Sequence, residues 1–186
     1  MAEVEPSTAG IDSERVLELV NLARRTYGGG ELDGLLPGEP LSASFCPLGR
    51  SLRSGVGDWL FVAVGTRHLR LWTLDKDPAH VARAILRAWG LPQKRLKKSS
   101  EGAGCAVIPL PSELSDFVIR FDQGLLPDYQ AEVDGDEVRR LSELARKIPL
   151  PRVRKAGAGG AAQPADLSGL HASVWQTSHP PPGPSV

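Results

Sequence analysis

Residues 59–72 read WLFVAVGTRHLRLW, and this stretch decides the fold class. Its first six residues are apolar, and its last six largely alternate between polar and apolar side chains. This pattern predicts two β-strands. Gly65 and Thr66 fit a two-residue turn with glycine in the first position. That turn would pair Val64 with Arg67 and would set the register of the whole hairpin.

In this register, Val62 lies opposite Leu69 on the face that we expect to line the core. Four residues belong to that face: Leu60, Val62, Leu69 and Leu71. On the other face, Trp59 would meet Trp72 and Phe61 would meet Arg70. This second face is too aromatic to be left in water, so we expect another element to cover it.

The hairpin is flanked by segments with helical spacing of apolar residues, and many of these segments have capping residues before them and glycines after them. Five helices are predicted, near residues 12–27, 47–53, 78–89, 111–123 and 134–148. Residues 105–108 predict a third strand, and residues 93–100 a basic loop. The fold class is therefore α+β, with a small three-stranded sheet packed by about five helices.

The chain of 186 residues suits one domain with tails. We expect a flexible lead over residues 1–10 and a single α+β domain over residues 11–148. Residues 149–186 are rich in proline, glycine and alanine, so they predict a disordered tail. No apolar run has the roughly 20 residues of a membrane helix, and residues 1–20 lack the pattern of a signal peptide. These features predict a cytoplasmic protein, with its two cysteines as free thiols.

The net charge of zero is a sum of blocks of opposite sign. Residues 40–98 carry 11 basic and 3 acidic side chains, whereas residues 99–138 carry 1 basic and 9 acidic ones. Such blocks can place a basic and an acidic face on one molecule, which would matter for the choice of partner.

Cys46 is the most suggestive residue for chemistry. It precedes Pro47, which predicts a thiol at the start of a helix, where backbone amides favour the thiolate. Arg50 and Arg53 follow on the same helix and would add positive charge. The alternative is a small buried cap, because free cysteine is among the most buried residue types.

Other catalytic or cofactor signatures are missing from the sequence. Four residues are candidate metal ligands: Cys46, His68, His80 and Cys105. They do not form the close pairs of a zinc site. Gly28-Gly29-Gly30 follows a predicted helix and therefore reads as a helix stop, not as a phosphate-binding loop. We expect no cofactor and no metal.

Basic residues in the second hairpin strand and in the following loop indicate an alternative, nucleic-acid binding. The candidate residues are Arg67, Arg70, Lys94, Arg95, Lys97 and Lys98. The neutral net charge and the lack of a known motif favour a solvated loop instead.

Two segments resemble small uncharacterised proteins of actinobacteria and their phages. One is residues 46–52, CPLGRSL, and the other runs from VIPLP at residues 107–111 through FVIRFDQG at residues 117–124 to Pro127. They cover about a fifth of the chain, and the resemblance implies no activity.

With no motif for catalysis, we expect a non-enzymatic interaction module that binds another protein. Nucleic-acid binding through residues 67–98 and thiol chemistry at Cys46 remain the alternatives.

Overall fold

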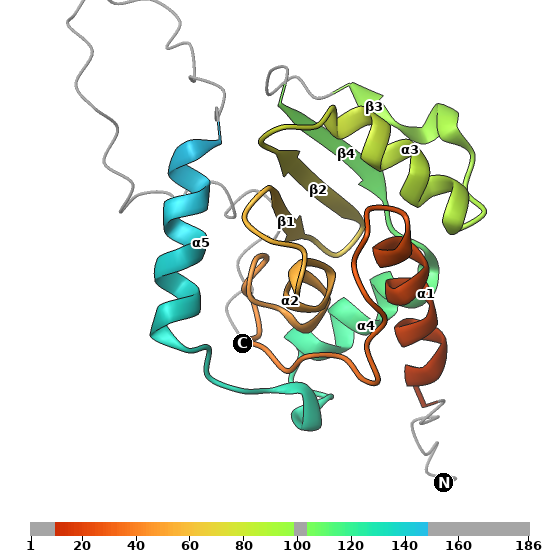
Figure 1. Ribbon diagram of the computed structural model, residues 1–186. Helices are drawn as coiled ribbons and strands as arrows, with labels where there is room; N and C mark the ends of the chain where they lie inside the picture. The colour runs from red at the N-terminus through yellow and green to blue at the C-terminus, as the bar shows by residue number, and fades with distance from the viewer. Residues whose placement is uncertain (1–9, 99–103, 149–186) are drawn as a thin grey trace, which may run out of the picture. The chain divides into compact units, whose positions relative to one another are not determined.

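The computed structural model describes residues 10–98 and 104–148, and these residues form the predicted α+β fold (Figure 1). The predicted tail at residues 149–186 and nearly all of the predicted lead at residues 1–10 lie outside the described residues. Among the described helices, none has the length and apolar character that crossing a bilayer requires.

All five predicted helices are present, each within two residues of its expected ends. They are α1 (Ser13–Arg25), α2 (Pro47–Arg53), α3 (Pro78–Ala88), α4 (Ser112–Asp122) and α5 (Gly135–Lys147). Local chemistry explains their starts: Asp12 and Asp77 accept hydrogen bonds from Arg15 N and Ala79 N at the beginning of α1 and α3. At α2, the Cys46 thiol takes this role and accepts from Gly49 N.

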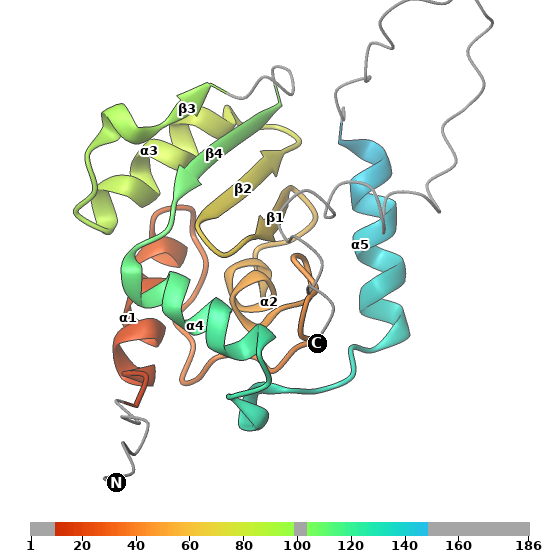
Figure 2. The same ribbon diagram turned by 180° about the vertical axis from the view of Figure 1, so that it is seen from behind.

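The three predicted strands form an antiparallel sheet (Figure 2). They are β1 (Leu60–Val64), β2 (His68–Thr73) and β4 (Cys105–Pro109), and β2 lies in the middle of the three. The expected basic loop is not wholly irregular, however. It contains a short 3-10 turn, η1 (Gln93–Arg95), and a two-residue strand, β3 (Lys97–Lys98), which extends the sheet beyond β4.

The predicted hairpin register is wrong by two residues. Val64 pairs with Leu69 instead of Arg67, and the turn is centred on Thr66 and Arg67. Gly65 N donates to His68 O across this turn, and Gly65 does not have the positive φ that the predicted turn type needs. Hydrogen bonds outside the hairpin support the observed register, since Leu110 N donates to Arg67 O and Val64 N donates to Ala43 O.

A shift of two residues leaves the side chains within the two strands on their predicted faces, because strand side chains alternate with a period of two. The four predicted core residues of the hairpin are therefore buried, and they join the larger apolar cluster with α1, α2, α3 and α4. The predicted pairs are wrong: Val62 lies opposite Leu71, and Ala63 lies opposite Arg70.

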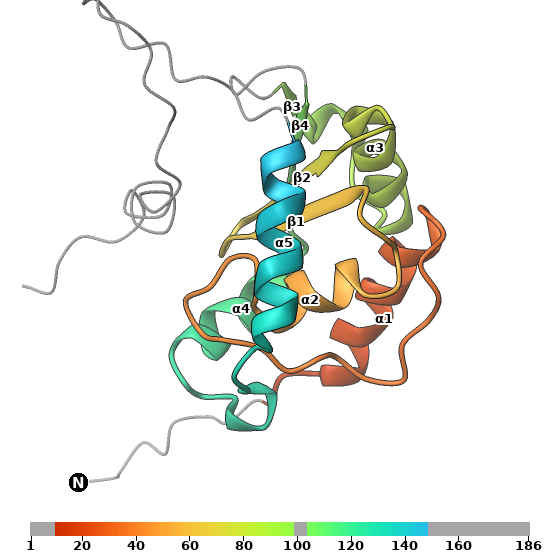
Figure 3. The ribbon, with the colours of Figure 1, turned by 60° about the vertical axis from the view of Figure 1, so that its left-hand side comes forward.

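The second face of the sheet is covered, as expected, and the cover is α5 (Figure 3). Trp72 lies there beside Phe61, with ring centroids 5.3 Å apart, and both belong to a smaller cluster with α5. The predicted contact between Trp59 and Trp72 is wrong. Trp59 precedes β1 and packs against Tyr27, which follows the end of α1, with ring centroids 6.3 Å apart.

Candidate functional site

Cys46 is buried in the larger apolar cluster. Its Sγ accepts a hydrogen bond from Gly49 N at 3.4 Å, as a helix cap does. Burial raises the pKa of the thiol to about 11, which is more than the helix amides and Arg53 can offset. A reactive cysteine needs exposure and a lowered pKa, so the structure favours the capping role for Cys46.

The predicted nucleic-acid-binding residues lie along β2, η1 and β3. Arg67 is exposed at the hairpin turn, and Lys94 is exposed in η1. Arg70 and Lys97 both pair with Val107 of β4, so the register places them in one row across the sheet. The backbones of Arg95 and Lys98 continue the same segment. The side chains of Arg95, Lys97 and Lys98 are not among those described.

The candidate metal ligands are dispersed over four elements. His68 is in β2, His80 in α3 and Cys105 in β4, while Cys46 precedes α2. No group of three His, Cys, Asp or Glu side chains within residues 10–98 and 104–148 is arranged to hold a metal ion.

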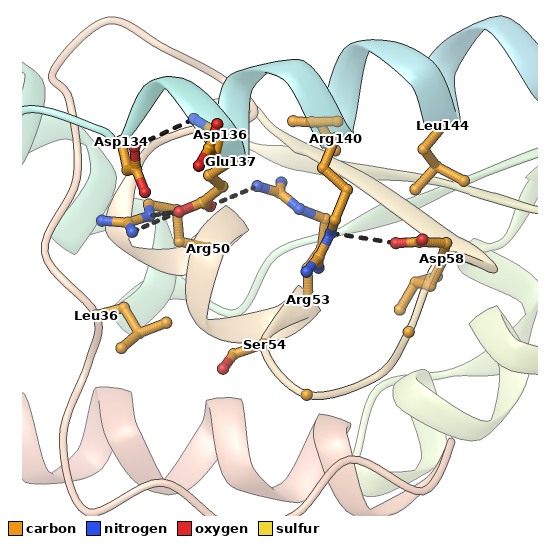
Figure 4. Close-up of a pocket in the computed structure, with 14 residues that line it drawn as sticks. Leu36, Arg50, Arg53, Ser54, Asp58, Asp134, Asp136, Glu137, Arg140 and Leu144 are labelled. Carbon is orange, nitrogen blue, oxygen red and sulfur yellow. Dashed lines mark hydrogen bonds and ion pairs between the residues drawn. The ribbon is translucent and has the colours of Figure 1, made fainter.

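A pocket of about 400 Å³ lies between α2, the loop at residues 54–59 and the beginning of α5. We call it the α2–α5 pocket. Leu36, Leu60, Leu141 and Leu144 supply its apolar wall. Its polar wall contains three arginines, Arg50, Arg53 and Arg140 (Figure 4).

Glu137 of α5 is the carboxylate that two of these arginines share. Nε of Arg50 lies 3.1 Å from both carboxylate oxygens, and Nη2 of Arg50 lies 2.5 Å from Oε2. Nη2 of Arg53 approaches Oε1 only to 3.6 Å, which is too long for a hydrogen bond. The third arginine, Arg140, pairs with Asp58 through Nε at 3.2 Å.

Arg53 is the most unusual of the three arginines, because it is 7% exposed. Its Nη1 donates to Ser44 O and Val62 O, and its guanidinium lies over the ring of Phe45. Its Nη2 is buried without a hydrogen-bond partner. Burial lowers the pKa of Arg53 to about 10, although Glu137 raises it.

A second feature is an exposed apolar surface at the end of α4. Leu41 is 74% exposed, Leu125 is 62% exposed and Ile119 is 37% exposed, and these are the large apolar side chains left exposed in the described part of the chain. Leu41 N donates to Asp122 Oδ1 at 2.8 Å, and Asp122 lies one helical turn after Ile119. We call Leu41, Ile119 and Leu125 the Leu41 patch.

The chain reversal after α4 turns the backbone at Leu125 back toward the helix. Gly124 has a positive φ, and Leu125 N donates to Arg120 O at 3.0 Å. In this type of helix end, the residue in the position of Leu125 packs over the last turns of the helix. Leu41 itself has φ +60, which is rare and costly for a residue other than glycine.

The sequence reasoning missed both features for identifiable reasons. Asp134 and Glu137 have the spacing of a capping box, yet Glu137 binds Arg50 instead of the backbone. The sequence links Arg50 and Arg53 only to Cys46, because these three residues are close in the chain. Their spacing of three residues on α2 was the available signal that they share a face. Leu41 lies in a connector, where no periodicity marks an exposed leucine.

Comparison of the chain with protein-family models, with curated proteins and with solved structures found no match.

Proposed function

We propose that this chain is a non-enzymatic protein-binding module and that the Leu41 patch is its contact surface. The observation that carries the proposal is Leu41, which points its side chain into solvent from a left-handed backbone conformation. Backbone strain of this kind concentrates at functional sites. The hydrogen bond from Leu41 N to Asp122 holds the strained residue against α4.

The patch joins two segments that are 78 residues apart in sequence, Leu41 in the connector and Ile119 on α4. Scattered exposed apolar residues need no explanation, but a group of them marks an interaction surface. An exposed leucine and an isoleucine can anchor a partner in the way that central apolar residues do in protein interfaces.

The charges around the patch specify the chemistry of the partner. Asp116 and Asp122 lie three residues before and after Ile119, so they flank it on the same side of α4. We therefore expect a partner that presents apolar side chains with Lys or Arg beside them, since complementary charges steer association. The two free cysteines agree with a cytoplasmic setting.

A photo-crosslinking residue placed at Leu41, in cells that express the full chain, tests this function. We expect a discrete protein adduct that is absent when the crosslinker replaces Arg87, which is exposed on α3. The purified partner should then bind the wild-type chain and lose at least about tenfold in affinity for Ile119→Asp, measured at a temperature at which both proteins are fully folded. Equal adducts from both positions, or unchanged binding by Ile119→Asp, would refute the proposal.

Nucleic-acid binding is a second candidate, and the sheet register favours it. Arg70 and Lys97 lie on either side of Val107 in one row across the sheet, so the register aligns basic positions from two segments of the chain. Replacement of Lys94, Arg95, Lys97 and Lys98 by alanine should weaken binding to every sequence and reduce its salt dependence. Absence of measurable binding to single-stranded DNA and RNA at low salt would end this alternative.

A further inference from the structure

We propose that the α2–α5 pocket is a binding site for a small ligand with an oxyanion group, a phosphate or a carboxylate, and that Glu137 occupies the position of that group in the unliganded chain. The site is separate from the Leu41 patch, and the inference does not depend on protein binding.

The unpartnered donor of Arg53 is the first argument. Buried polar groups in proteins nearly always have hydrogen-bond partners, and an exception calls for an explanation. Nη2 of Arg53 is buried, faces the pocket and lies 3.6 Å from the nearest carboxylate oxygen (Figure 4). An oxyanion that entered the pocket could accept a hydrogen bond from this group, and from Arg50 beside it.

The rigidity of Arg53 is the second argument. Ser44 O and Val62 O fix Nη1, and the guanidinium carbon lies over the Phe45 ring, 5.9 Å from its centroid. The side chain is therefore held in place before any ligand arrives, so binding costs little side-chain entropy. Arginine also presents its donors as a planar fork that matches carboxylate and phosphate oxygens.

The balance of charge is the third argument. Three guanidinium groups face two carboxylates, Glu137 and Asp58, and Asp58 is occupied by Arg140. The other acidic groups of the lining are engaged elsewhere: Asp134 caps α5, and Asp136 pairs with Arg139. One carboxylate thus serves Arg50 and Arg53 together.

The size and walls of the pocket define the rest of the ligand. A volume of about 400 Å³ is within the range of about 300–1,000 Å³ that is common for small-molecule sites. Leu36, Leu60, Leu141 and Leu144 offer apolar contact next to the arginines. The ligand therefore has an apolar body of modest size attached to its oxyanion group.

Glu137 is the side chain that can make way for the ligand. It is 30% exposed, whereas the side chain of Arg53 is 8% exposed, so the carboxylate can turn toward solvent while the arginine stays. Glu137→Gln keeps the shape of the side chain and removes its charge. This variant should leave Arg50 and Arg53 without an internal anion and should increase the affinity of the pocket for an external one.

The experiment uses the full chain and measures the affinity of inorganic phosphate and of acetate by chemical shifts, with chloride at the same ionic strength as reference. We expect at least one of the two anions to bind the wild type weakly and Glu137→Gln roughly tenfold more tightly. The chemical-shift changes should occur at Arg53 and in α5. The stronger of the two anions identifies the oxyanion class. Glu143→Gln is the matched control, since it makes the same change at an exposed position of α5 outside the pocket.

Arg53→Lys should abolish the binding gained by Glu137→Gln, because lysine cannot present the planar fork of donors. If Arg53→Lys fails to fold, the comparison of Glu137→Gln with Glu143→Gln still tests whether the pocket binds an oxyanion. The proposal is overturned if neither anion binds Glu137→Gln better than chloride does, or if Glu143→Gln gains the same affinity.

Discussion

Gly38 joins two segments that are far apart in the chain, the connector before α2 and the turn η2 (Pro127–Tyr129). Gly38 N donates to Tyr129 O at 2.8 Å, and Ala131 N donates to Gly38 O at 2.9 Å. A Cβ atom at this position would lie 2.1 Å from Phe45 O, so only glycine allows the approach. The bridge holds the connector in the position from which Leu41 reaches Asp122.

Gly38→Ala should therefore lower the free energy of unfolding by about 3 kcal/mol or more, because the clash is with backbone and cannot be relieved by a rotamer change. Urea unfolding followed by fluorescence measures the loss. Gly34→Ala in the same connector meets no atom within 4 Å and should be nearly neutral. Equal losses for the two variants would contradict the role of Gly38.

The Cys46 thiol makes a separate, pH-dependent contribution. Its folded pKa of about 11 is above the ordinary value of 9.0, so the unfolded chain loses its proton first as the pH rises. The folded state then binds more protons, and the free energy of unfolding falls with pH. Between pH 9 and pH 10 this amounts to about 1 kcal/mol.

Urea unfolding at several pH values should show this decline in the wild type and a flatter line for Cys46→Ala. The variant also loses the cap on Gly49 N, which lowers its stability at every pH without changing the slope. Tyr27, whose pKa is raised by burial, and Arg53, whose pKa is lowered by burial to about 10, also begin to titrate in this window. They are present in both proteins, so the difference between the two lines reports on the thiol. Parallel lines for the two proteins would show that the thiol is not the titrating group.

Among the elements, α5 and the hairpin define the second face of the sheet. Val138 is half-buried, and Leu141, Leu144 and Ile148 are buried against this face. They cover Trp72 and Phe61, which would otherwise be exposed aromatic residues. This contact makes the two aromatic residues a part of the core and removes them from the surfaces available to a partner.

Trp72→Ala should consequently cost about 3–5 kcal/mol in the free energy of unfolding, as for a core aromatic residue. Trp59→Ala should cost less, since Trp59 is only half-buried. Trp72→Phe should be mild, because Nε1 of Trp72 is buried without a partner and its loss removes an unsatisfied donor. A Trp72→Ala protein as stable as the wild type would show that α5 does not cover this face in solution.

Across the whole described unit, the sheet separates two apolar clusters of unequal size. The larger cluster packs the sheet against α1, α2, α3 and α4, whereas the smaller one packs it chiefly against α5. Each cluster contains one buried free cysteine, Cys46 in the larger and Cys105 in the smaller. The two thiols can therefore report on the opening of the two sides.

We expect Cys105 to react with a thiol reagent faster than Cys46, because release of α5 breaks fewer contacts than unfolding of the whole unit. Leu144→Ala should accelerate labelling of Cys105 by about tenfold or more and that of Cys46 much less. Mass spectrometry of the labelled peptides gives both rates. Identical rates in both proteins would show that the two sides open as one cooperative unit.

The positions of the helices and main strands were predictable from the sequence, because their signals are local. Asp12, Asp77 and Asp134 precede helices that they cap, and alternation with a period of two sorted the hairpin side chains onto their correct faces. Even the wrong register preserved those faces, since the error was an even number of residues. The same alternation also predicted that another element covers the aromatic face of the sheet.

Only the tertiary structure decided the register, the burial of Arg53 and the composition of both candidate sites. The register depends on hydrogen bonds that Ala43 and Leu110 make with the hairpin from other parts of the chain. Glu137 meets Arg50 across 87 residues, and Leu41 meets Asp122 across 81. Local spacing carries no information about such contacts, because their partners are selected by how the helices pack on the sheet and not by the sequence on either side.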